Sequence, residues 1–269
     1  MSDAIDLYLD LMKRTLTYLV YGQEHFRPIE RPQSLIKAKI YDALRRRNVT
    51  PMRPFPINRE VRIQGRDWPP TAYTMVGLKR LDNLQQCAAN VIRDAVPGDF
   101  IEAGTWRGGA AIFLRAILKA YAIENRFLYV ADSFEGLPPA DPERYPVDAC
   151  FDIPDQLAVS LDQVKLNFSR FGLLDDQVRF VKGWFKHTLP TLSDRRFSLI
   201  RLDGDLYEST MDSLRYLYPS LSIGGYIIID DYGGVPMCRE AIQDFRDINQ
   251  ITEPIQEVDW TGVYWQKKA

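Results

Sequence analysis

The feature that most constrains the fold is a regular alternation of short apolar runs and amphipathic segments that begins near residue 72. The apolar runs lack the polar–apolar alternation of a half-exposed strand, which indicates burial on both faces. Strands that alternate with helices predict a doubly wound α/β fold with a mainly parallel sheet. We expect strands over 99–104, 126–132, 177–183, 197–203, 224–231, 255–260 and 262–267, and helices over 74–96, 108–122, 158–172, 209–218 and 238–249.

Residues 1–70 follow a different pattern, and we interpret them as an N-terminal helix and an arm that precede the α/β domain at 71–269. Apolar residues at helical spacing predict a helix over 3–20. After a short helix-like stretch, residues 48–70 are rich in Pro and Arg and offer few places for regular structure. This segment is either a solvated surface arm, with Arg53, Arg59 and Arg62 in water, or a lid over a site.

Composition narrows the choice of partners. The 269 residues carry 34 basic and 36 acidic side chains, and a net charge of −2 gives no support for a nucleic-acid or anionic-membrane partner. The apolar runs are far shorter than the roughly 20 residues of a membrane helix. Three widely spaced cysteines favour a reducing compartment over a disulfide framework. We therefore expect a cytoplasmic protein that acts on a small molecule.

A glycine-rich turn joins the first predicted strand of the α/β domain to its helix. In "DFIEAGTWRGGAA", Gly104 and Gly108 allow a tight turn, and the next helix offers free N–H groups to an anion. The spacing differs from the G-x-G-x-x-G of dinucleotide binders. The following strand ends in Asp132, a position from which an acid commonly accepts hydrogen bonds from ribose hydroxyls. Together these signals favour an adenosine-containing ligand that carries an amino-acid anion.

Two later strands end in pairs of carboxylates. Asp203 and Asp205 follow one apolar run in "RLDGDLYESTM", and Asp230 and Asp231 follow the next in "GGYIIIDDYGG". Crowded carboxylates repel one another unless a cation offsets their charge. Oxygen ligands suit Mg²⁺, whereas a chain with two histidines and scattered cysteines offers no zinc site. We expect Asp203, Asp230 and Asp231 to hold the ion; the alternative is that they are solvated strand ends.

Several blocks of the sequence together resemble the macrocin O-methyltransferase family: "DFIEAGTWRGGAA", "VADSFEGLPP", "VKGWFKHTLP", "IRLDGDLYEST" and "GGYIIIDDYG". The resemblance covers roughly residues 50–269 and is closest to members that 4-O-methylate the deoxysugar of novobiocin-type compounds. These enzymes use S-adenosylmethionine to methylate sugar hydroxyls of natural products. The resemblance implies a Rossmann-like class I methyltransferase with a seven-stranded sheet, S-adenosylmethionine and Mg²⁺ as cofactors, a glycosylated small-molecule acceptor, and a homodimer or larger assembly.

The resemblance also implies roles for individual residues. The residues implied to contact the cofactor are Met75, Glu102, Gly104, Thr105, Gly108, Asp132, Ser133, Gly183, Trp184 and Asp203. Asp205 is implied to be the general base that accepts the proton of the attacking hydroxyl as the methyl group is transferred in line. A simpler alternative for Asp205, or for Ser209, is the N-cap of the following helix.

Other functions remain compatible with parts of the sequence. Asp203-Gly204-Asp205 has the D-x-D form with which a glycosyltransferase can hold a cation against a nucleotide diphosphate. That function leaves the glycine turn and the second acidic pair without a role. A methyltransferase for catechol-type phenols or acyl-CoA esters would share both cofactors, but the long N-terminal arm favours a bulkier acceptor. A non-catalytic binding module is disfavoured because the acids are present at every expected position.

Overall fold

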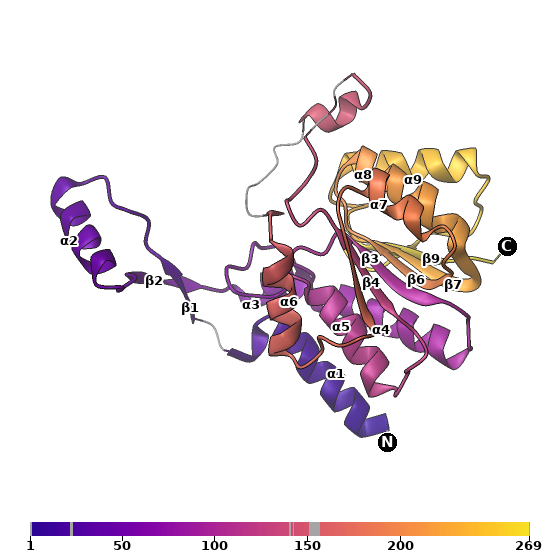
Figure 1. Ribbon diagram of the computed structural model, residues 1–269, viewed down its shortest axis with the longest axis horizontal. Helices are drawn as coiled ribbons and strands as arrows, with labels where there is room; N and C mark the ends of the chain where they lie inside the picture. The colour runs from indigo at the N-terminus through magenta and orange to yellow at the C-terminus, as the bar shows by residue number, and fades with distance from the viewer. Residues whose placement is uncertain (1, 22–23, 140, 142, 151–156, 269) are drawn as a thin grey trace.

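A seven-stranded sheet lies between two layers of helices in the computed structural model, which describes residues 2–21, 24–139, 141, 143–150 and 157–268 (Figure 1). The strand order is β5-β4-β3-β6-β7-β9-β8; all pairs from β5 to β7 are parallel, whereas β9 runs antiparallel to β7 and β8 to β9. The strands are β3 (Asp99–Ala103), β4 (Leu128–Asp132), β5 (Val178–Lys182), β6 (Phe197–Leu202), β7 (Leu221–Ile229), β8 (Gln256–Glu257) and β9 (Val263–Gln266).

Each face of the sheet has its own hydrophobic core. One core includes Leu9, Leu81, Ile112 and Phe168. The other core includes Leu214. The first core lies under α1 (Ser2–Leu16), α4 (Leu78–Arg93), α5 (Gly109–Ala120) and α6 (Leu161–Arg170). The second lies under α7 (Phe185–Thr188), α8 (Tyr207–Leu217) and α9 (Pro236–Ile248). Short 3₁₀ segments are η1 (Leu19–Tyr21), η2 (Pro146–Cys150), η4 (Leu189–Leu192) and η5 (Tyr218–Ser220).

The order of the strands creates a crevice at one edge of the sheet. From β3 the chain adds β4 and β5 on one side, and then returns to add β6 and β7 on the other. The carboxyl ends of β3 and β6 therefore lie side by side at the point where the direction of winding reverses. In doubly wound sheets ligands bind outside the carboxyl ends of the strands at this point.

The predicted parallel α/β architecture is confirmed, with differences at element ends. Residues 255–260 contribute only the two-residue strand β8, whereas the strand expected over 262–267 is present as β9. The first helix ends at Leu16 rather than at residue 20, because Tyr18 adopts a left-handed conformation with φ 64° before η1. Helix α1 packs against α5 through Leu9, Met12 and Leu16, so it shares the core of the α/β domain.

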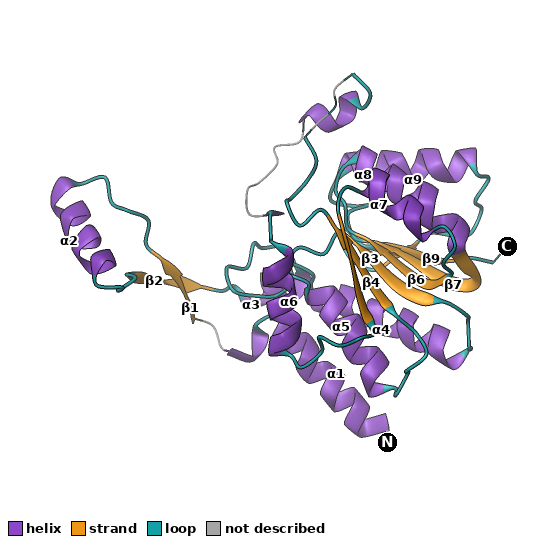
Figure 2. Cartoon of the chain, viewed as in Figure 1, coloured by secondary structure: helices purple, strands orange, loops and turns teal. Residues whose placement is uncertain are grey.

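The expectation of little regular structure over residues 48–70 was wrong, because β2 (Met52–Pro56) and α3 (Arg59–Gln64) lie there. Strand β1 (Glu24–Pro28) pairs antiparallel with β2, α2 (Leu35–Arg46) lies between them, and α3 follows. The prolines are tolerated because a two-stranded ribbon has two open edges, where a missing N–H costs no ladder hydrogen bond. The β1–β2 ribbon and α2 project away from the body of the molecule (Figures 1 and 2).

Arg62 also differs from the expectation of a solvated side chain, because it is fully buried. Its Nη2 donates to the carbonyl oxygens of Met75 (2.6 Å) and Val76 (2.9 Å), and its Nη1 lies 2.8 Å from Asp67 Oδ1. Arg62 thus anchors the segment after α3 to the start of the α/β domain. Within the described residues, no helix combines the length and the apolar character needed to cross a membrane.

Candidate active site

A cavity of about 510 Å³ opens at the carboxyl ends of the parallel strands. It takes residues from the ends of β3, β4, β6 and β7, from the segment after α3, and from the C-terminal segment at Trp260 and Thr261. The predicted site residues on its wall are Met75, Glu102, Gly104, Thr105, Asp132, Ser133, Gly183, Trp184, Asp203, Asp205, Asp230 and Asp231. The strand order therefore brings together nearly all of the residues that the sequence singled out.

Gly104 and Gly108 shape the turn that begins the cavity, in different ways. A Cβ on Gly104, which has φ 89°, would lie 1.7 Å from the carbonyl oxygen of Asp203, so only glycine allows β3 and β6 to approach this closely. Gly108 is not on the cavity wall. It is the left-handed N-cap of α5, and a Cβ there would meet Val164 at 3.0 Å.

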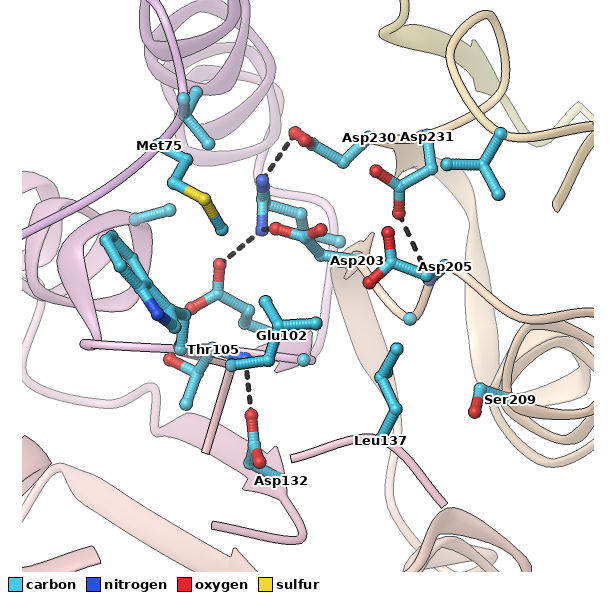
Figure 3. Close-up of a pocket in the computed structure, with 18 of the residues that line it drawn as sticks. Met75, Glu102, Thr105, Asp132, Leu137, Asp203, Asp205, Ser209, Asp230 and Asp231 are labelled. Atoms are coloured by element: carbon cyan, nitrogen blue, oxygen red, sulfur yellow. Dashed lines mark hydrogen bonds and ion pairs between the residues drawn. The ribbon is translucent and has the colours of Figure 1, made fainter. Parts of the chain in front are cut away.

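The first half of the cavity holds Met75, Glu102, Thr105 and Asp132 (Figure 3). Asp132 accepts hydrogen bonds from the backbone N–H of Thr105 and of Phe134, both at 2.7 Å. Burial raises the pKa of Asp132, and these amides oppose the rise. These bonds fix the carboxylate at the edge of the cavity, where a ribose could meet it.

Glu102 lies at the floor of the same half and is almost fully buried. Its Oε2 accepts from the Thr105 hydroxyl at 3.0 Å, and its Oε1 lies 2.6 Å from Arg201 Nη1. Burial raises the pKa of Glu102 to about 7, although the Arg201 charge acts in the opposite direction. Because its two oxygens have fixed partners, Glu102 is a rigid acceptor for a polar ligand.

The second half of the cavity holds the four aspartates that end β6 and β7 (Figure 3). Asp203, Asp230 and Asp231 each offer one oxygen, and these three oxygens lie within 4.8 Å of one another. Burial, followed by repulsion from Asp230, raises the pKa of Asp203, and burial with repulsion from Asp205 raises that of Asp231 well above its usual value. The protein groups thus leave part of the negative charge uncompensated, and this oxygen set fits a hard divalent cation.

Asp230 differs because two buried guanidinium groups hold it. Arg201 Nη2 donates to its Oδ1 and Arg80 Nη1 to its Oδ2. Burial alone would raise the pKa of Asp230, but the Arg201 and Arg80 charges outweigh it and hold the pKa below its usual value. Asp230 is therefore ionised in the folded protein.

Sequence reasoning missed both arginines. An arginine inside the buried strand "FSLIRLD" is a signal that could have revealed Arg201, since a buried guanidinium requires carboxylate partners. Arg80 has no such signal, because its role depends on which face of α4 meets the sheet. Besides Asp230, Arg80 contacts Asp259 at 3.1 Å and the carbonyl oxygen of Gly65 at 3.2 Å.

Asp205 lies directly beside the three aspartates. Its backbone is left-handed, with φ 55°, and its N–H donates to Asp231 Oδ2 at 3.2 Å. Burial and the neighbouring Asp203 and Asp230 carboxylates raise the pKa of Asp205 to about 7. Helix α8 takes Leu206 as its N-cap, and its first amides donate to Asp148, so neither Asp205 nor Ser209 caps it.

The mouth of the cavity is lined by part of the segment that we considered as a lid. Gly65, Arg66, Asp67 and Trp68 belong to its wall, whereas Phe55 lies on the projecting ribbon. Trp260 Nε1 donates to the carbonyl oxygen of Gln64 at 2.9 Å, which joins this segment to the C-terminal part of the chain. A lid role for residues 65–68 stays a prediction.

Comparison with known proteins identifies the family. The family described as Macrocin-O-methyltransferase (TylF) matches residues 5–267. The chain belongs to the macrocin O-methyltransferase family. It is accordingly an S-adenosylmethionine-dependent O-methyltransferase, as the sequence blocks led us to expect.

Curated members of the macrocin O-methyltransferase family align along almost the whole chain. The 8-demethyl-8-(2,3-dimethoxy-alpha-L-rhamnosyl)-tetracenomycin-C 4'-O-methyltransferase of Streptomyces olivaceus is 49% identical, over 100% of this chain and 95% of its own. The mycinamicin III 3''-O-methyltransferase of Micromonospora griseorubida is 45% identical, over 100% of this chain and 99% of its own. The demethyldecarbamoylnovobiocin O-methyltransferase of Streptomyces niveus is 43% identical, over 97% of this chain and 93% of its own.

A solved structure supports the same assignment. That of the O-methyltransferase NovP superimposes with a TM-score of 0.83 at 41% sequence identity, and the match covers 98% of this chain and 100% of NovP. The match extends over both the arm and the α/β domain, so the fold described above is that of the family.

Proposed function

We propose that this O-methyltransferase methylates a sugar hydroxyl of a glycosylated natural product, with Mg²⁺ at the aspartate cluster and Asp205 as general base. The observation that carries the proposal is the cluster of Asp203, Asp230 and Asp231 beside Asp205, in the same cavity as the cofactor residues. The name of the Streptomyces olivaceus relative, whose substrate carries a rhamnosyl group, supports this acceptor class.

The two halves of the cavity would bind different groups. Glu102 and Asp132 would hold and orient the nucleoside part of S-adenosylmethionine, and Asp203, Asp230 and Asp231 would hold Mg²⁺. When bound, S-adenosylmethionine supplies an electrophilic methyl group and Mg²⁺ supplies a Lewis acid that makes the acceptor hydroxyl more acidic. Asp205 would accept the hydroxyl proton as the acceptor oxygen takes the methyl group, and the neutral thioether S-adenosylhomocysteine would be the leaving group.

Asp205 suits the role of base for two reasons. Burial, which acts with or without a bound cation, raises the pKa of Asp205, and a raised pKa makes a carboxylate a stronger base. Its left-handed backbone directs the side chain beside the aspartate cluster rather than along α8. Positioning of the two substrates supplies much of the remaining acceleration.

The test is methyl transfer from radiolabelled S-adenosylmethionine, with Mg²⁺, to three acceptors: mycinamicin III, demethyldecarbamoylnovobiocin and 8-demethyl-8-(2,3-dimethoxy-alpha-L-rhamnosyl)-tetracenomycin C. We expect turnover of at least one, and a loss of about 10²–10⁴ in kcat for Asp205→Asn. Asp247→Asn, an exposed change on α9, is the matched control and should leave kcat unchanged. Turnover of none of the three acceptors, or full activity of Asp205→Asn, would contradict the proposal.

We also propose that the protein forms a homodimer or larger assembly. The ribbon and the 12-residue helix α2 project from the body, and Leu35 and Ile36 on α2 are 81% and 74% exposed. A two-stranded ribbon and a short helix are marginal in isolation, so a second copy that covers them would stabilise both. Light scattering after size-exclusion chromatography should give a dimer mass or more, and a monomer at micromolar concentration would contradict this expectation.

A further inference from the structure

Helix α8 receives its N-terminal cap from a distant part of the chain. Its N-cap residue, Leu206, has no side chain that could serve. Instead Asp148 in η2, 59 residues before Tyr207, accepts the N–H of Tyr207 at 2.7 Å with Oδ1 and the N–H of Glu208 at 3.0 Å with Oδ2. Asp148 is only 2% exposed. Both carboxylate oxygens thus bind the first amides of the helix, where the helix dipole also favours an anion.

The two elements joined by Asp148 line the same part of the cavity. Helix α8 contributes Glu208, Ser209 and Asp212 to the wall, and the connection between β4 and α6 contributes Leu137 and Leu157 on either side of Asp148 in the chain. Leu137 and Ser209 lie on the Asp205 side of the cavity, away from Met75 (Figure 3). This side is left for the acceptor once the cofactor occupies the other half.

The cap also lies next to the proposed base. Asp205 stands two residues before the first turn of α8, in a left-handed conformation that is unfavourable for a non-glycine residue. The buried side chain of Leu206 and the bond from the Asp205 N–H to Asp231 hold it there. If the first turn of α8 loosens, Asp205 loses one of the two fixed ends that keep this conformation.

The geometry points to Asp148 as a positioning residue that ties η2 to the first turn of α8, and so sets acceptor affinity and the direction of Asp205 together. The roles of Asp205 and of the acceptor side rest on the proposed function, whereas the cap does not. Asp148 touches neither reacting atom. Its effect reaches the reaction through the backbone of residues 205–208 and through the wall residues of α8, Glu208, Ser209 and Asp212.

The experiment compares Asp148→Ala and Asp148→Asn with the wild-type protein. Amide exchange measured by NMR should rise about tenfold at Tyr207, Glu208 and Asp205 in Asp148→Ala, and less in Asp148→Asn, which keeps one acceptor oxygen. With an acceptor from the panel above, the acceptor KM should rise about tenfold while the Kd for S-adenosylhomocysteine stays within about twofold. Asp141→Asn, an exposed change in the same connection, is the matched control.

The outcomes separate this proposal from the proposed function. If the wild-type protein methylates none of the panel, the proposed acceptor class fails, and amide exchange still decides the role of Asp148. Unchanged exchange at Tyr207 and Glu208 would overturn the cap. Faster exchange there with a fully protected Asp205 amide, or equal losses of acceptor and cofactor affinity, would overturn the positioning role, because Asp148 would then be a cap for α8 alone.

Discussion

Arg80 and Arg201 hold opposite oxygens of a single carboxylate, that of Asp230. Arg201 also contacts Glu102 at 2.6 Å and Asp203 at 2.9 Å, so one buried guanidinium links the Glu102 half of the cavity to the aspartate cluster. Arg80 also contacts Asp259 and the carbonyl oxygen of Gly65, and it therefore links the aspartate cluster to the mouth of the cavity. The two halves of the active site form one connected polar network.

Loss of Arg201 should destabilise the whole protein. Its neighbours Glu102, Asp203 and Asp230 are largely buried, and removal of a partner from buried charges costs about 3–5 kcal/mol. We expect Arg201→Met to lower the free energy of unfolding by about this amount in urea denaturation at neutral pH. The control is Arg195→Met at an exposed pair with Asp194, where a change within about 0.5 kcal/mol is expected. Equal stabilities of the two variants would show that the network contributes nothing.

Gly104→Ala should damage both the fold and cofactor binding. The added Cβ would lie 1.7 Å from the Asp203 carbonyl oxygen, so β3 and β6 would have to separate at the site. We expect a loss of about 3 kcal/mol or more in unfolding free energy and no measurable binding of S-adenosylhomocysteine by calorimetry. Gly172→Ala is the comparison: it shares a left-handed φ, 64°, but a Cβ there meets nothing within 4 Å. It should cost only about 1 kcal/mol, and a similar loss at both sites would refute the close-approach explanation.

The stabilisation by Mg²⁺ should grow with pH. Without a cation, burial raises the pKa of Asp205 to about 7, so the folded protein keeps a proton that the unfolded chain releases near pH 4. The stability from that proton is fully present below about pH 4 and is lost as pH rises through about 7. Because a bound Mg²⁺ favours the ionised forms of its ligands Asp203 and Asp231 and of the adjacent Asp205, the gain in Tm from saturating Mg²⁺ should be larger at about pH 8 than at about pH 6.

Differential scanning fluorimetry of the wild-type protein and of Asp205→Asn checks the pH dependence. Asp205→Asn has no titrating carboxyl at this position. The gains in Tm from Mg²⁺ at about pH 6 and about pH 8 should therefore differ less in the variant than in the wild type. A gain that is equal at both pH values in the wild type, or larger at the lower one, would contradict a cation bound by the aspartate cluster.

The parts of the site that could be predicted are those fixed by strand order. Asp203, Asp230 and Asp231 meet because they end neighbouring parallel strands, and that follows once the apolar runs are assigned to one sheet. Arg80 could not be predicted, because a helix can present any of its faces to a sheet. The cap of α8 by Asp148 was also missed, since residues that are 59 positions apart leave no local pattern.

The arm illustrates the same limit at the level of the fold. Its two strands pair across α2, without the two-residue turn that makes a hairpin recognisable in a sequence. A proline-rich composition normally disfavours strands. Here both strands have an open edge, and a proline whose missing N–H would face that edge does not break the pairing. Local signals sufficed for the α/β domain, where each parallel strand is followed by its own helix.

Metal removal tests the role of the aspartate cluster most directly. Wild-type protein is treated with a chelator, dialysed, and assayed for methyl transfer from S-adenosylmethionine to whichever panel acceptor it methylates, first without metal and then with Mg²⁺ restored. Turnover should fall to background without metal and return with Mg²⁺, and Asp231→Asn should need a higher Mg²⁺ concentration for half-maximal rate. Full turnover by the metal-free protein would contradict the central claim that the aspartate cluster acts by holding a cation.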